Sequence, residues 1–83
     1  MRIGEQAVIA TNCAGTENPE MLDILAKLDK NGDKEAVELI IASRQAILLK
    51  KGLMVSVRHA KIGKVQVELL SGRKVWVYYE NLE

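Results

Sequence analysis

The sequence predicts an α+β domain in which two helices interrupt a small antiparallel sheet. Apolar residues in the middle of the chain recur at helical spacing, whereas beyond residue 52 they alternate with polar residues in three short runs. The chain has 83 residues, of which 48% are hydrophobic and 28% charged, the balance of an ordinary globular domain. Because a chain of this length builds one core, we expect residues 1–83 to form a single domain.

The beginning of the chain predicts one strand followed by a loop. A short β-rich run, Gln6-Ala7-Val8-Ile9-Ala10-Thr11, follows Gly4, so we expect the first strand within residues 5–11. Residues 12–18 contain Gly15, Thr16 and two asparagines, a composition typical of loops.

Residues 18–45 predict two consecutive helices. Asn18 is a favourable N-cap, and Pro19 follows at the first helical position, where its missing N–H does no harm. Asn31-Gly32 ends the first helix, and Asp33 caps the second. The apolar stripes comprise Met21, Leu22, Ile24, Leu25 and Leu28, then Ala36, Val37, Leu39, Ile40 and Ile41. Helices of this length are unstable alone, so both need a surface to cover.

Residues 46–83 predict an antiparallel meander that follows a short apolar run. The alternating apolar positions are Leu53, Val55 and Val57, then Val65, Val67 and Leu69, then Val75, Val77 and Tyr79. The glycine-containing segments Lys61-Ile62-Gly63 and Ser71-Gly72-Arg73 separate these runs. So short a sheet has to curl or be covered to bury its apolar face.

This part of the chain resembles a Src homology 3 domain. The similar features are the turn Lys50-Lys51-Gly52, Gly63 before the following strand, the turn Ser71-Gly72-Arg73, the pair Trp76-Val77 and the ending Asn81-Leu82-Glu83. The resemblance covers residues 46–83 and the first strand. It implies a small antiparallel barrel in which residues 18–45 form a two-helix insertion after the first strand.

Members of that family bind proline-rich peptides between stacked aromatic rings. The sequence differs from the family at the positions of those rings. The first strand has no tyrosine, and Lys64 occupies the position of a tryptophan. The family's Pro-Ser-Asn-Tyr type segment reads Tyr78-Tyr79-Glu80-Asn81 here. Because recognition of a proline helix depends on those rings, we do not expect proline-rich peptides as ligands.

Charge is divided unevenly along the chain. Residues 1–47 hold five Lys/Arg and eight Asp/Glu, and residues 48–83 hold seven and three, so the halves carry −3 and +4 within a net charge of +1. A basic half can attract nucleic acid, and residues 57–65 are also similar to Tudor-like and KOW-type barrels of nucleic-acid machinery. Mutual attraction of two halves of one domain explains the same asymmetry.

The sequence predicts no catalytic, metal or cofactor site. Cys13 and His59 are the chain's one thiol and one imidazole, and no local motif joins them. The segment Asp29-Lys30-Asn31-Gly32-Asp33 resembles the start of a calcium loop, but Lys34 and Ile40 stand where such a loop needs Gly and Glu. We therefore expect a protein that is not an enzyme.

Neither a membrane span nor an oxidising compartment is predicted. The uninterrupted apolar runs are far shorter than the roughly 20 residues of a span, and the first residues lack the apolar stretch of a secretory signal. A lone Cys13 cannot form an internal disulfide. These observations favour a cytoplasmic protein.

The candidate binding residues lie in the last alternating run and in the segments expected to pair beside it. If Val75 and Val77 face the interior, Trp76 and Tyr78 face outward. The candidate site comprises Trp76, Tyr78, Arg58, Lys64, Gln66 and Lys61. Two alternatives stay open. These residues form an exposed surface of rings and cations that binds a ligand, or the helices cover Trp76 and Tyr78, which are then core residues.

The sequence as a whole predicts a non-enzymatic binding module. Its expected partner is another protein or a second copy of the chain. The alternative is nucleic-acid binding through the basic second half, and such binding would weaken steeply as salt rises.

Overall fold

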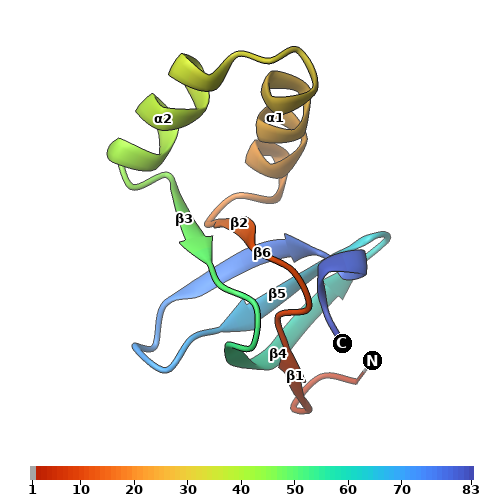
Figure 1. Ribbon diagram of the computed structural model, residues 1–83. Coiled ribbons are helices and arrows are strands. Elements are labelled where there is room, and N and C mark those ends of the chain that lie inside the picture. The colour runs from red at the N-terminus through yellow and green to blue at the C-terminus, as the bar shows by residue number, and fades with distance from the viewer. Residues whose placement is uncertain (1) are drawn as a thin grey trace.

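A computed structural model of the chain describes residues 2–83 and confirms the α+β class (Figure 1). In chain order the elements are β1 (Gln6–Val8), β2 (Cys13–Thr16), α1 (Pro19–Lys30), α2 (Lys34–Ala42), β3 (Ala46–Leu49), β4 (Met54–Lys61), β5 (Lys64–Glu68), β6 (Lys74–Tyr78) and the 3-10 turn η1 (Tyr79–Asn81). The predicted meander is present as β4, β5 and β6, and η1 follows β6.

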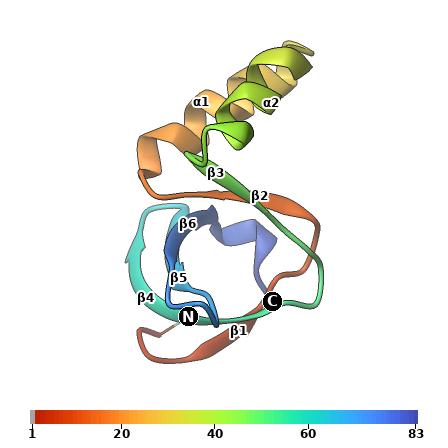
Figure 2. The ribbon, with the colours of Figure 1, turned by 90° about the vertical axis from the view of Figure 1, so that its left-hand side faces the viewer.

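The strands form one antiparallel sheet in the order β1-β4-β5-β6-β2-β3. Figure 2 shows how strongly this sheet curls around its inner face. The two end strands, β1 and β3, do not pair with each other, so the sheet is open. A closed barrel, which the family resemblance implied, is therefore not confirmed.

The prediction of a loop at residues 12–18 was wrong, because Cys13–Thr16 forms β2. This strand pairs along its length with β3, and Thr16 also pairs with Trp76 of β6. Gly15 permits the close approach, since a Cβ atom there would lie 2.7 Å from Cγ2 of Val75. Long-range pairing thus outweighs local composition, and the two-helix insertion follows β2 instead of the first strand.

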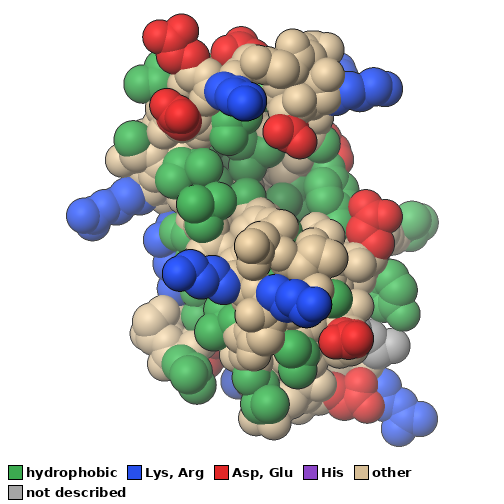
Figure 3. All heavy atoms as spheres, viewed as in Figure 1, with side chains coloured by type: hydrophobic (Ala, Val, Ile, Leu, Met, Phe, Trp, Pro, Cys, Tyr) green, Lys and Arg blue, Asp and Glu red, His purple; other side chains and the backbone are tan. Residues whose placement is uncertain are grey.

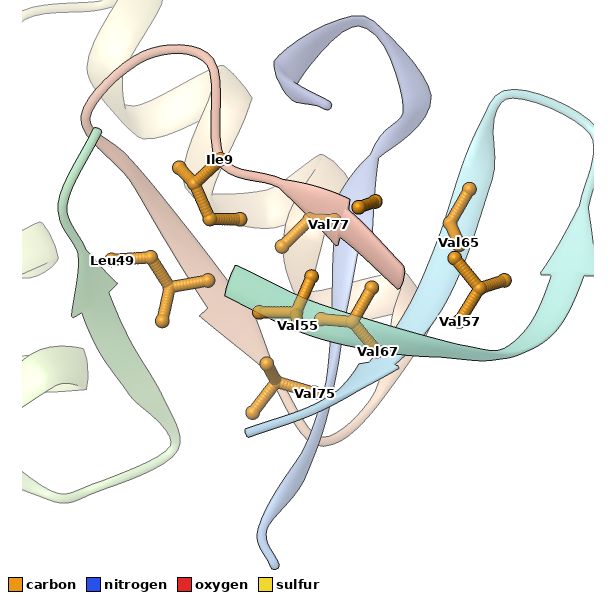
Figure 4. Packing of buried hydrophobic residues seen from close by; sticks show 9 residues of the cluster. Ile9, Leu49, Val55, Val57, Val65, Val67, Val75 and Val77 are labelled. Carbon is orange, nitrogen blue, oxygen red and sulfur yellow. The ribbon is translucent and has the colours of Figure 1, made fainter. Parts of the chain in front are cut away.

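The core lies on the inner face of the curled sheet (Figure 4). Its buried members are Ala7, Ile9, Leu49, Val55, Val57, Val65, Val67, Val75 and Val77. Most come from the alternating positions of the meander, as the sequence predicts. Burying a side chain of this size contributes roughly 1.5–3 kcal/mol, so each buried valine stabilises the sheet.

The helical hairpin stands on the outer side of β2 and β3 (Figures 1 and 2). Both predicted caps are confirmed: Asn18 Oδ1 accepts a hydrogen bond from the Glu20 amide, and Asp33 Oδ1 accepts one from the Ala36 amide. Helix α1 buries Leu22 and Leu25, whereas α2 buries no residue fully. Over residues 2–83, neither helix has the length and apolar character needed to span a membrane.

Candidate functional site

Strand pairing brings most of the sequence-predicted site residues together on the outer face of the sheet. Trp76 lies opposite Gln66, and Tyr78 lies opposite Lys64, which in turn lies opposite Lys61. Arg58 belongs to none of these cross-strand pairs and lies at the bulge between Val57 and His59. The predicted residues are therefore neighbours, with Arg58 at their margin.

Trp76 is covered, because only 6% of its surface is exposed. Thr16 lies beside it on β2, and the His59 ring meets the indole edge-on with the ring centroids 5.8 Å apart. Lys61 Nζ lies 5.3 Å from the centroid of the indole ring, within the range of a cation–π contact. The indole face is thus occupied by neighbours from its own chain.

Tyr78 and Lys64 fasten α1 to the sheet through one carboxylate. Lys64 Nζ donates to Asp23 Oδ2 at 2.7 Å and to the Pro19 carbonyl at 3.1 Å, and the Tyr78 hydroxyl donates to Asp23 Oδ1 at 2.7 Å. Burial, together with the neighbouring Asp23, raises the pKa of Tyr78 to about 12. The hydrogen bonds from Lys64 and Tyr78 lower the pKa of Asp23.

The other candidate residues do not form a continuous cationic surface. Arg58 Nε lies 3.2 Å from Glu68 Oε1, and Gln66 is half-buried. Arg73, outside the predicted set, forms an ion pair with Glu17 at 3.1 Å. Several cations of the basic half are thus neutralised within the chain.

An apolar groove that the sequence did not predict lies between the helical hairpin and the sheet. It encloses about 520 Å³. Its lining includes Leu22 and Leu25 of α1, Val37 and Ile41 of α2, Leu48 of β3, Cys13 and Ala14 of β2, and Tyr78 of β6. Leu48 is 68% exposed, an unusual degree for a leucine within a strand. Figure 3 shows hydrophobic side chains gathered in the waist between the helices and the sheet.

Two signals in the sequence point to this groove in retrospect. The run Ala46–Leu49 is apolar at every position, although a strand with one buried face alternates. The apolar stripe of α2 includes Val37 and Ile41, which line the groove, although no residue of this helix is fully buried. Both signals are local, but only the fold shows that they border the same groove.

One thiol borders the groove. Cys13 lies in its wall, half-buried, and burial raises the pKa of the thiol, which disfavours the nucleophilic thiolate. Within residues 2–83, no three side chains of the His, Cys, Asp or Glu type gather as metal ligands would. Asp33, part of the calcium-loop-like segment, caps α2.

Comparison with protein-family models, with curated proteins and with solved structures found no match to this chain. The fold and the groove define it as an α+β protein in which a helical hairpin stands over an open, curled antiparallel sheet.

Proposed function

We propose that this protein is a non-enzymatic binding module and that its ligand is a segment of another protein held in the apolar groove. One observation carries the proposal: α2 buries no residue fully, and its groove-facing residues Val37 and Ile41 lie across from the exposed Leu48. Exposed apolar surface gathered in a concave site is typical of protein-binding surfaces. Filling the groove would bury Val37 and Ile41 more fully.

We also propose that the sheet is a variant of the Src homology 3-like barrel, opened by the helical insertion. The meander, its turns and the helical turn η1 support this relationship. The peptide-binding grooves of that family would need aromatic rings, and this chain's single Trp76 is covered. The ligand is therefore proposed to be apolar and not proline-rich, and the lone Cys13 favours a cytoplasmic setting.

Nucleic-acid binding through the basic half is the less favoured alternative. Stacking on bases needs exposed rings, whereas Trp76 is covered and the Tyr78 hydroxyl is bonded to Asp23. Lys64 and Arg58 are each paired with a carboxylate of the chain. These intramolecular partners would have to be displaced before the cations could bind phosphate.

Selection from a random peptide library tests the proposed function. We expect enriched peptides to be apolar and to bind Leu48→Ser at least about tenfold more weakly than the unaltered protein. Leu70→Ser is the matched control, because Leu70 is also an exposed leucine, lies outside the groove and should leave binding unchanged. The proposal is wrong if no peptide is enriched, or if the protein instead binds labelled RNA or DNA with a steep dependence on salt.

A further inference from the structure

The two end strands of the sheet differ in how their free edges are treated. The chain end covers β1: the Val8 amide donates to the Glu83 carbonyl at 3.3 Å, the Glu83 amide donates to the Val8 carbonyl at 2.9 Å, and Ile9 pairs with Leu82. Strand β3 pairs with β2 alone. Within residues 2–83, no further backbone hydrogen bond reaches Ala46–Leu49 from outside that pairing.

The free edge of β3 also lacks the usual protection. Because pairing with one neighbour uses alternate backbone groups, the remaining N–H and C=O groups of an end strand point away from the sheet. Proteins usually guard such an edge with a charged residue, a proline or a bulge. The sequence of β3, Ala46-Ile47-Leu48-Leu49, contains none of these.

We propose that the segment bound in the groove is extended and adds to β3 as a further strand of the sheet; this inference rests on the proposed function. Side chains of an added strand point alternately to its two faces. Those on the outer face would lie beside Leu48, at the margin of the groove, which continues from Leu48 over Ala14 of β2. Backbone hydrogen bonds would supply affinity, and the groove would select apolar side chains.

The charges around β3 define the flanks of the bound segment. Arg44 lies just before the strand, and Lys50 and Lys51 follow directly after it, all three exposed. In the described part of the chain, none of these three side chains forms an ion pair. Asp29, on the α1 wall, is the one acidic residue in the lining of the groove. The partner segment therefore carries acidic residues on both sides of an apolar run.

The same charges argue against a second copy of this chain as the occupant. Two β3 strands paired antiparallel about a two-fold axis between Ile47 and Leu48 would set Arg44 of each copy against Lys51 of the other. Like charges placed opposite each other across a strand pair are destabilising. A separate partner with acidic flanks avoids this repulsion.

Binding of designed peptides tests the inference. The probe is a fluorescein-labelled peptide Glu-Asp-Val-Thr-Ile-Thr-Val-Asp-Glu, and the comparison peptide has lysine at its four acidic positions. We expect the acidic peptide to bind at least about tenfold more tightly, and the variant Lys50→Glu/Lys51→Glu to reverse this preference. Both lysines are exposed at the end of β3, so the variant should fold normally.

N-methylation of the peptide backbone separates strand addition from docking by side chains alone. Methylating one alternate set of amides should weaken binding at least about tenfold, while methylating the other set should not, because only one set faces β3. Equal binding of both methylated peptides, or no binding of the acidic peptide at ~1 mM, overturns the inference. If library-selected peptides still depend on Leu48 in that case, the proposed function stands; if none do, both fail.

Discussion

Asp23 of α1 and Lys64 of β5 form an ion pair across the junction between the helical hairpin and the sheet, with Lys64 Nζ 2.7 Å from Asp23 Oδ2. The second carboxylate oxygen accepts a hydrogen bond from the Tyr78 hydroxyl, so one side chain of α1 is held by two strands. Asp23 is largely exposed, and solvent screens the ion pair. The arrangement fixes the position of α1, and with it one wall of the groove.

The titration of Tyr78 reports this contact. The pKa of Tyr78 is raised to about 12 from its ordinary 10.0, first by burial and then by Asp23. In Asp23→Asn it should fall only part of the way back, because the carboxylate that disfavours the phenolate is lost while the burial remains. Absorbance at the phenolate band measures it, in a Tyr79→Phe background that leaves one tyrosine. Since the folded-state pKa is raised, the stability due to Tyr78 is complete below pH 10 and is lost as pH rises toward 12. An unchanged titration in Asp23→Asn would contradict the contact.

The stability that Asp23 contributes depends on pH in the opposite sense and is lost in acid. Its pKa is lowered in the folded protein, so its contribution is present above the ordinary value of 3.8 and is lost as pH falls below it. We expect the amides of α1 to exchange hydrogen faster at pH 3 than those of β4 and β5, after correction for intrinsic rates. In Asp23→Asn, this additional acid sensitivity of α1 should disappear. If acid speeds hydrogen exchange in α1 equally in the unaltered protein and in Asp23→Asn, titratable groups other than Asp23 cause the acid sensitivity.

Fluorescence quenching tests the covered position of Trp76. Because the indole is 6% exposed, acrylamide should quench its emission much less than that of free tryptophan amide. The chain has one tryptophan, so the signal needs no assignment. Quenching as efficient as that of the free amide would show that the ring is open to solvent and would revive the exposed-surface alternative.

Gly15→Ala tests the close approach of β2 to β6. The added Cβ would lie 2.7 Å from Val75 Cγ2, and such overpacking costs about 1–3 kcal/mol of the free energy of unfolding. Urea denaturation measures the loss. In the double variant Gly15→Ala/Val75→Ala, the loss should be smaller than the sum of the two single losses, because the clashing methyl group is gone. If the losses of the two single variants simply add in the double variant, the contact between residue 15 and Val75 is not the source of the strain.

Arg73 connects both ends of the helical hairpin to the sheet. Its Nη2 donates to the Arg44 carbonyl after α2 at 2.8 Å and lies 3.1 Å from Glu17 Oε1 before α1. Arg73→Met should therefore destabilise the protein by about 1 kcal/mol and speed hydrogen exchange in both helices. Lys74→Met is the matched control, since Lys74 is the adjacent, exposed cation. If the two variants change stability and helix exchange equally, Arg73 does not hold the helical hairpin on the sheet.

Local patterns in the sequence predict the elements of this fold well. Alternation identifies the meander because its strands have one buried face, and Asn18 and Asp33 mark the helix starts because capping is a local interaction. Strand β2 could not be predicted from local patterns. Its glycine and polar residues are typical of loops, and only pairing with β3 and β6 makes it a strand.

The groove could not be predicted for the same reason. Val37 and Leu48 are distant in the chain, and each alone resembles an ordinary core residue. The sequence directs attention instead to Trp76 and its cationic neighbours, whose outward orientation is correctly derived from strand alternation. Their partners on α1 and β2 depend on the packing of the hairpin, which no local pattern encodes.

Mapping a bound peptide by ¹H–¹⁵N correlation spectroscopy tests the central proposal most directly. With a library-selected peptide, we expect shift changes at Leu25, Ile41 and Leu48, which line the groove, and none at Arg58 or Lys61. The opposite pattern, with changes confined to Arg58, Lys61 and their neighbours on the sheet, would contradict the groove as the binding site.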